Sequence, residues 1–126
     1  MIYGIGVDIT EIKRIEKAIS RNTNFINKLF TDSEIDILEK RNFRPEFVAG
    51  RFAAKEAISK AFGTGIRNFS FKDMEIINDS LGKPEVILKT KAQDVVTNIG
   101  KSYKIHLSIS HEREYAVAYA LLEVFI

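Results

Sequence analysis

The residues best suited to chemistry are two acids and a lysine that lie far apart along the chain. Asp8 ends a short stretch in which apolar residues alternate with glycine, and Glu56 and Lys60 lie four positions apart in a later segment. An Asp at the end of a strand and a Glu on a helix can each give one oxygen to Mg²⁺, leaving its other positions to water and phosphate. With Lys and Arg nearby, these acids suit a phosphate-ester site.

Each of these residues also has an ordinary structural explanation. Asp8 can cap the helix that follows it, and Glu56 with Lys60 can be an exposed ion pair that contributes roughly 0.3 kcal/mol. Helical steps of about 100° per residue place five side chains on one arc: Phe52, Lys55, Glu56, Ser59 and Lys60. The opposite arc is apolar and contains Phe47, Ala54, Ile58, Ala61 and Phe62. We therefore expect a polar arc on which Glu56 is flanked by two ammonium groups.

The composition excludes several classes of site. The chain has no Cys and only two His, His106 and His111, which excludes thiolate zinc sites, iron–sulfur clusters, a Cys nucleophile and a polyimidazole metal site. It contains no G-x-S-x-G motif, which disfavours a serine hydrolase. Its formal net charge is +2, too small for general coating of nucleic acid.

The hydrophobic pattern is mixed and predicts one domain over residues 1–126. Strands are expected at residues 5–9, 73–78, 85–88, 105–109 and 115–125, the last two joined in a hairpin. Helices are expected after caps at Thr10, Thr31 and Thr90 and from Pro45 to Phe62, where Pro begins the helix and Gly63 follows it. No apolar run approaches the roughly 20 residues that span a bilayer, and no secretory signal is evident. We expect a cytoplasmic protein without a membrane partner.

A basic strip lies on the helix expected after Asp8. It consists of Lys13, Arg14, Lys17 and Arg21, opposite a stripe of Ile residues. The strip is either an ordinary solvated surface or a dock for an acidic partner. No aromatic platform for stacking single-stranded nucleic acid is evident beside it, so we expect no nucleic-acid partner.

The length of the chain limits the kind of site that it can enclose. A chain of 126 residues buries about two-thirds of its unfolded surface, enough for one core but not for a deep cleft between two domains. A large substrate would therefore need a site shared between subunits.

Four motifs together resemble one family. They are G-I-G-V-D at residues 4–8, F-A-A-K-E-A-I-S-K-A at 52–61, N-D-S-L-G-K-P at 78–84 and S-I-S-H at 108–111. In order and spacing they make the whole chain similar to the short phosphopantetheinyl transferases, and the first two motifs are the specific ones. The resemblance implies an α+β fold in which a small antiparallel sheet packs with helices, and a homotrimer with active sites between subunits.

The resemblance also implies an activity. Enzymes of this family transfer phosphopantetheine from coenzyme A to a serine of apo acyl carrier protein. They need magnesium, release adenosine 3',5'-bisphosphate and serve fatty acid biosynthesis. The basic strip would then be the dock for the carrier protein. The alternative from another class is a non-catalytic trimeric module that binds nucleotide or an acidic helical protein.

Site residues follow from the motif positions. The resemblance implies that Asp8 and Glu56 bind the metal and that Glu56, Lys60 and His106 are catalytic, with Lys60 near the pyrophosphate. The nucleotide pocket would include Arg51, Phe52 and Ser59, and the adjoining subunit would supply Gly82, Lys83, Pro84 and His106. Residues 39–47 align less well, so either Arg41 or Arg44 could contact the adenosine phosphate. The acceptor of the serine proton also stays open between Glu56, a metal-bound water and His106.

Overall fold

The computed structural model describes residues 1–63 and 69–126. A three-stranded antiparallel sheet has the strand order β1–β5–β4, with β1 at Ile2–Glu11, β5 at Tyr115–Phe125 and β4 at Ser102–His111. A smaller antiparallel sheet pairs β2 (Met74–Asn78) with β3 (Pro84–Leu88). The predicted α+β architecture with antiparallel sheets is confirmed, including the hairpin of β4 and β5.

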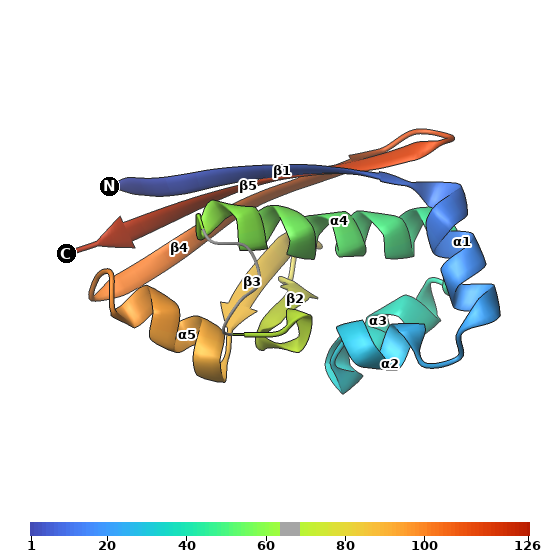
Figure 1. The fold of residues 1–126 in the computed structure, drawn as a ribbon, viewed down its shortest axis with the longest axis horizontal. Coiled ribbons are helices and arrows are strands. Elements are labelled where there is room, and N and C mark those ends of the chain that lie inside the picture. The colour runs from blue at the N-terminus through green and yellow to red at the C-terminus, as the bar shows by residue number, and fades with distance from the viewer. Residues whose placement is uncertain (64–68) are drawn as a thin grey trace.

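The long helix α4 (Pro45–Ala61) runs along one face of the larger sheet, and shorter helices lie towards its two ends (Figure 1). Helices α1 (Ile12–Arg21), α2 (Phe25–Leu29) and α3 (Asp32–Lys40) lie at one end, and α5 (Thr90–Thr97) lies at the other. Helix α2 and the 3₁₀ turn η1 at residues 71–73 could not be predicted from the sequence, because both are too short to show a period. Within the described ranges, no helix combines the length and hydropathy needed to cross a bilayer.

Two glycines bring α4 and β1 unusually close together. A Cβ at Gly4 would overlap the carbonyl oxygen of Ala61, and a Cβ at Gly6 would overlap that of Ala57. Two strand residues advance about 6.6 Å and four helix residues about 6.0 Å. The spacing of Gly4 and Gly6 along the strand therefore matches the spacing of Ala61 and Ala57 along the helix. Asp8, the next residue on this face of β1, lies beside α4.

The predicted apolar face of β1 is not the face that α4 covers. Ile5, Val7 and Ile9 are 57%, 50% and 67% exposed, because α4 packs on the side that carries Gly4 and Gly6. The outer face of β5 continues the exposed apolar surface with Tyr115, Val117 and Tyr119. The inner face of β5 is buried beneath α4 and contains Ala116, Ala118, Ala120, Leu122 and Val124. We refer to the exposed side chains of β1 and β5 as the outer apolar face.

Two of the three predicted helix caps are wrong. Thr31 does form a capping box with Glu34 at the start of α3. Thr10 instead lies within β1, and its hydroxyl donates to Asp8. Thr90 lies within α5, and its hydroxyl donates to Asp73 Oδ1 at 2.8 Å. The N-caps of α1 and α5 are instead Glu11 and Lys89, so neither threonine stands at the position where its oxygen could accept from the first-turn N–H groups.

Candidate active site

Asp8, Glu56 and Lys60 meet in one pocket beside the contact of β1 with α4. The pocket has a volume of about 300 Å³, and Phe52 and Arg14 also line it. Lys60 Nζ donates to the carbonyl oxygen of Val7 at 3.0 Å and lies 3.4 Å from Asp8 Oδ1. The three groups that the sequence singled out for phosphate chemistry thus share one solvent-open space.

The electrostatics of this pocket favour a cation. Burial raises the pKa of the Glu56 carboxyl, the negative charge of Asp8 raises it further, and Lys60 opposes both effects. Two carboxylates that repel each other in this way gain from a positive ion that both can contact. In the described part of the chain no third Asp, Glu, His or Cys joins them. This donor set fits Mg²⁺, which takes one or two protein carboxylates and keeps its other positions for water and phosphate.

One wall of the pocket is apolar. Ile15 and Ala18 of α1 and Phe25 of α2 face Phe52 of α4 across it. The rings of Phe25 and Phe52 stack with their centroids 6.2 Å apart. The rings of Phe71 and Phe52 pack edge to face, with their centroids 5.7 Å apart. The pocket therefore has a charged end for phosphate and an apolar wall for a less polar group. Sequence analysis missed this wall, because its residues belong to elements whose contacts are not local.

The basic strip begins at this pocket. Its residues Lys13, Arg14, Lys17 and Arg21 are all exposed on α1, and Arg14 also lines the pocket. A positively charged surface therefore leads along α1 from the pocket to the end of that helix.

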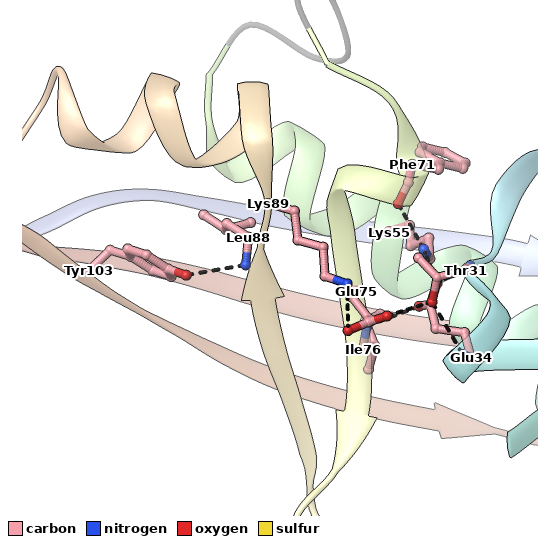
Figure 2. A network of polar contacts seen from close by, with 9 residues as sticks. All are labelled: Thr31, Glu34, Lys55, Phe71, Glu75, Ile76, Leu88, Lys89 and Tyr103. Atoms are coloured by element: carbon pink, nitrogen blue, oxygen red, sulfur yellow. Dashed lines mark hydrogen bonds and ion pairs between the residues drawn. The ribbon is translucent and has the colours of Figure 1, made fainter. Parts of the chain in front are cut away.

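Lys55 does not belong to the polar arc that sequence analysis predicted. Its ammonium group is fully buried and donates to Glu34 Oε1 and to the carbonyl oxygen of Phe71, each at 2.8 Å. The other carboxylate oxygen of Glu34 accepts from the backbone N–H of Ile76 at 2.9 Å (Figure 2). Glu56 is thus not flanked by two ammonium groups, because α3 covers this side of α4 and supplies the partner for Lys55.

A second acid extends this arrangement into the smaller sheet. Glu75 accepts from the Thr31 hydroxyl at 2.6 Å, and Lys89 Nζ lies 3.1 Å from its other oxygen (Figure 2). Burial lowers the pKa of Lys55, while the charge and hydrogen bond of Glu34 counteract that effect. We call Thr31, Glu34, Lys55, Glu75 and Lys89 the buried ion network. It joins α3, α4 and β2.

Two residues expected at the nucleotide pocket, Arg51 and Ser59, do not line the pocket of Asp8. Arg51 is only 7% exposed, and its Nη2 donates to Asn78 Oδ1 at 2.7 Å. Its other terminal nitrogen is buried without a hydrogen-bond partner among the described residues. The guanidinium groups of Arg51 and Arg41 both lie 5.0 Å from the centre of the Phe47 ring. Ser59 is buried, and its hydroxyl donates to the carbonyl oxygen of Glu56.

The residues expected from an adjoining subunit line a separate groove. Lys83, Pro84 and His106 lie along a space of about 540 Å³ between β3 and β4. His106 is exposed, and its Nε2 lies 3.0 Å from Glu123 Oε1. Within one chain this groove shares no lining residue with the pocket of Asp8.

Gly82 shapes the turn that leads into this groove. Its φ of 84° lies in the left-handed region that favours glycine. The carboxylate of Asp79 accepts from the backbone N–H groups of Leu81 and Lys83, each at 2.9 Å. These two hydrogen bonds hold Lys83 and Pro84 in place at the start of β3.

Comparison with known proteins identifies the family. A model of the 4'-phosphopantetheinyl transferase superfamily matches residues 4–120. The chain belongs to this family, and the resemblance carried by the four motifs is confirmed. It is 59% identical, over 98% of its length and 89% of the relative, to a holo-[acyl-carrier-protein] synthase of Clostridium novyi. It is 53% identical to the enzyme of that name from Fusobacterium nucleatum, over 97% and 99% of the two chains.

Solved structures agree with this identification. A holo-(acyl-carrier-protein) synthase from Bacillus anthracis in complex with CoA (3',5'-ADP) superposes with a TM-score of 0.81, at 44% identity over 99% of both chains. The synthase from Neisseria meningitidis gives a TM-score of 0.88 at 37% identity, over 98% of this chain and 99% of that one.

Proposed function

We propose that this chain transfers the phosphopantetheine group of coenzyme A to a serine of an apo acyl carrier protein and releases adenosine 3',5'-bisphosphate. The observation that carries the proposal is the pocket in which Asp8, Glu56 and Lys60 meet, in a chain whose relatives are holo-acyl-carrier-protein synthases. We take residues 1–126 as one domain with this activity. The reaction would take place in the cytoplasm and would supply carrier protein for fatty acid biosynthesis.

Asp8 and Glu56 are the residues that would hold magnesium. When bound there, the ion would neutralise charge on the pyrophosphate oxygens of coenzyme A. The serine oxygen forms a bond to the phosphorus that bears pantetheine, and the bond from this phosphorus to the adenosine bisphosphate breaks. Lys60 places a mobile positive charge where the leaving group becomes more negative.

The serine proton must pass to a base as the new bond forms. Glu56 lines the pocket, and both burial and the charge of Asp8 raise the pKa of its carboxyl. The groups that could accept this proton are Glu56, a metal-bound water and His106 of an adjoining subunit.

The pocket of Asp8 and the groove of His106 are separate within one chain, and a homotrimer is the assembly in which they would meet across subunits. The outer apolar face exposes Ile5, Val7 and Ile9 beside Val117 and Tyr119, and exposed apolar patches of this kind mark sites of association. Burial of this face between subunits could bring the groove of Lys83, Pro84 and His106 against a neighbour's pocket. Coenzyme A would then lie between two chains, as the length of the chain requires.

The carrier protein would approach along the basic strip. Arg14 lies at the pocket, and Lys17 and Arg21 continue the strip along α1. An acidic helix aligned with them would place its serine near the charged end of the pocket. Complementary charge of this kind mainly raises the association rate and fixes the orientation of the partner.

Mass spectrometry of the carrier protein tests the proposed reaction. We expect an apo carrier incubated with the protein, coenzyme A and Mg²⁺ to gain the mass of one phosphopantetheine, with release of an equal amount of adenosine 3',5'-bisphosphate. A carrier in which the acceptor serine is replaced by alanine is the control and should gain nothing. If coenzyme A binds but no mass is gained, the chain is the non-catalytic nucleotide-binding module instead.

Sedimentation velocity tests the trimer, and mixing of inactive subunits tests the shared site. Asp8→Asn chains mixed with His106→Ala chains should regain part of the transfer activity, because one mixed cleft receives an intact half-site from each parent. Each variant assayed alone is the control. An active monomer, or an active trimer whose mixed variants stay inactive, would contradict a site shared between these two regions.

A further inference from the structure

Thr10 makes a short contact with the proposed metal ligand Asp8. The two residues lie two positions apart on the face of β1 that packs on α4. Thr10 is only 6% exposed, and its hydroxyl donates to Asp8 Oδ2 at 2.7 Å. This distance matches a well-formed O–H···O hydrogen bond, and a charged acceptor strengthens it.

Among residues 1–63 and 69–126, few other groups orient the Asp8 carboxylate. The residues paired with Asp8 and Thr10 in β5 are Ala118 and Ala116, which are buried and have no polar side-chain atom. Lys60 lies farther away, 3.4 Å from Oδ1, and its side chain is 53% exposed. A threonine side chain is also stiff about its first torsion, because its Cβ is branched. Of the contacts that the described residues make with this carboxylate, the hydrogen bond from Thr10 is therefore the shorter and the more constrained.

The helix that follows β1 takes no side-chain cap from Thr10. The N-cap of α1 is Glu11, which makes no side-chain hydrogen bond to the helix. Thr10 lies one residue before this N-cap, within β1, and its hydroxyl donates to Asp8. Its placement thus serves the pocket and not the start of α1.

We propose that Thr10 is a positioning residue for the magnesium site. Its hydroxyl holds Oδ2 of Asp8, so the carboxylate keeps one orientation in the pocket that it shares with Glu56. Without this bond the carboxylate would rotate broadly about its terminal torsion, and the ion would have to order it on binding. The inference rests on the proposed role of Asp8 as a metal ligand.

Direct titration with Mn²⁺ tests this role without relying on turnover. The probe is Mn²⁺ added to the assembled protein in the presence of coenzyme A and followed by electron paramagnetic resonance. We expect Thr10→Val to bind Mn²⁺ about tenfold more weakly, the lower end of the effect of losing a partner of a metal ligand. Thr10→Ser keeps the hydroxyl and should restore most of the affinity. The Mg²⁺ concentration that gives half-maximal transfer should shift in parallel.

A matched substitution controls for the loss of a threonine hydroxyl in general. Thr97 of α5 is exposed, and its hydroxyl donates to a backbone carbonyl of its own helix. Thr97→Val should leave the affinity for Mn²⁺ unchanged. If Thr10→Val does not fold, as judged by thermal unfolding and sedimentation, Thr10→Ala removes the same hydroxyl without a replacement methyl group and takes its place.

The outcomes separate this inference from the proposed function. If Thr10→Val binds Mn²⁺ as tightly as wild type while Asp8→Asn does not, Thr10 has no positioning role and the metal assignment of Asp8 stands. If Asp8→Asn binds Mn²⁺ as tightly as wild type, the metal assignment and the role of Thr10 are both wrong. Failure of Thr10→Ser to restore affinity would also overturn the role of the hydroxyl.

Discussion

Helix α4 carries two acid–lysine clusters on adjacent residues, one closed and one open. Lys55 belongs to the buried ion network, where its side chain is 0% exposed and that of its partner Glu34 is 4% exposed. Glu56, the next residue, faces the pocket with Asp8 and Lys60, and the side chain of Lys60 is 53% exposed. The 100° step between neighbours on a helix separates the two environments.

The two clusters differ in how far the protein completes their interactions. In the buried ion network Glu34 accepts from Thr31, Lys55 and Ile76, so its charge is compensated within the fold. In the pocket the negative charges of Asp8 and Glu56 still oppose each other. The charges of the buried ion network are compensated within the fold, so this cluster stabilises the structure. The repulsion between Asp8 and Glu56 is only partly offset by Lys60, so a bound cation can still be stabilised there. We therefore expect the same residue types on one helix to act on stability in one cluster and on binding in the other.

The largest expected effect comes from removing an acid of the open cluster. Asp8→Asn and Glu56→Gln should each lower phosphopantetheine transfer by more than about 100-fold, since even the loss of a partner behind a metal ligand costs up to that much. Their thermal stability should stay the same or rise, because each change removes one of two repelling charges. Transfer rates by mass spectrometry and thermal unfolding measure the two effects. Near-normal turnover at ordinary Mg²⁺ would contradict the metal assignment.

The matching change in the closed cluster should act on stability. Lys55→Met leaves the Glu34 carboxylate buried without its charged partner, which costs about 3–5 kcal/mol in the free energy of unfolding. Urea denaturation at neutral pH measures this loss. A variant with unchanged stability would show that the buried ion network contributes little to the fold.

Replacing Lys60 by Met, five residues after Lys55, should lower the rate of the reaction and leave stability nearly unchanged. Lys60→Met should change the free energy of unfolding by less than about 1 kcal/mol, because its ion pair is half exposed. We expect kcat to fall by about 100-fold, with a smaller change in the KM for coenzyme A, since the charge of the leaving group grows in the transition state. Lys55→Met and Lys60→Met are controls for each other. A change confined to the KM would place Lys60 in ground-state binding.

A smaller effect is expected from the basic strip, which lies beside the open cluster. Lys17→Glu together with Arg21→Glu should raise the KM for the carrier protein roughly tenfold, which corresponds to about 1.4 kcal/mol, and should flatten its salt dependence. The KM for coenzyme A should not change. The matched control is the double substitution Lys72→Glu and Lys91→Glu, at exposed residues of η1 and α5. Loss of coenzyme A binding would assign the strip to the nucleotide.

The smallest effect concerns the pH dependence of the closed cluster. Burial acts to raise the pKa of the Glu75 carboxyl, but hydrogen bonds from Thr31 and Lys89, together with the charges of Lys89 and Lys55, outweigh it and hold the pKa below the ordinary 4.5. A depressed pKa contributes stability that is fully present above pH 4.5 and is lost as the pH falls through the folded-state pKa. The stability gap between wild type and Glu75→Gln should therefore narrow below that pH. Urea denaturation across the acid range measures it, and parallel profiles would contradict it.

The open cluster could be predicted from the sequence, whereas the closed one could not. Residue type and spacing single out Asp8, Glu56 and Lys60 as candidates, and the resemblance to the family places them in one site. The partner of Lys55 lies 21 residues away in another helix, and nothing in the sequence of α4 indicates that α3 covers this side. The motif around Thr31 revealed the capping role of Glu34 but not its second role.

The strand β1 shows a similar limit. Alternation of Ile5, Val7 and Ile9 predicts the strand correctly, but it does not show which face of the strand α4 covers. The glycines between them identify the covered face, because only a residue without a Cβ admits α4 so closely. Thr10 precedes a helical stripe of Ile residues and so predicts a helix cap, but β1 continues to Glu11 and the Thr10 hydroxyl donates to Asp8, two residues earlier on the same strand.

Because Gly4 and Gly6 of β1 contact Ala61 and Ala57 of α4 at matching spacings, a change of length in either segment would displace residues of the pocket. One residue inserted between Gly4 and Asp8 would turn the Asp8 side chain to the other side of the sheet, since strand side chains alternate. One residue inserted between Ala57 and Lys60 would rotate the later residue by about 100° around the helix axis. Point substitutions elsewhere can be absorbed by repacking, but insertions and deletions in these two segments cannot. Functional relatives should therefore differ in length outside residues 4–8 and 56–61, and a library of single-residue insertions scored for transfer would map these two segments as intolerant.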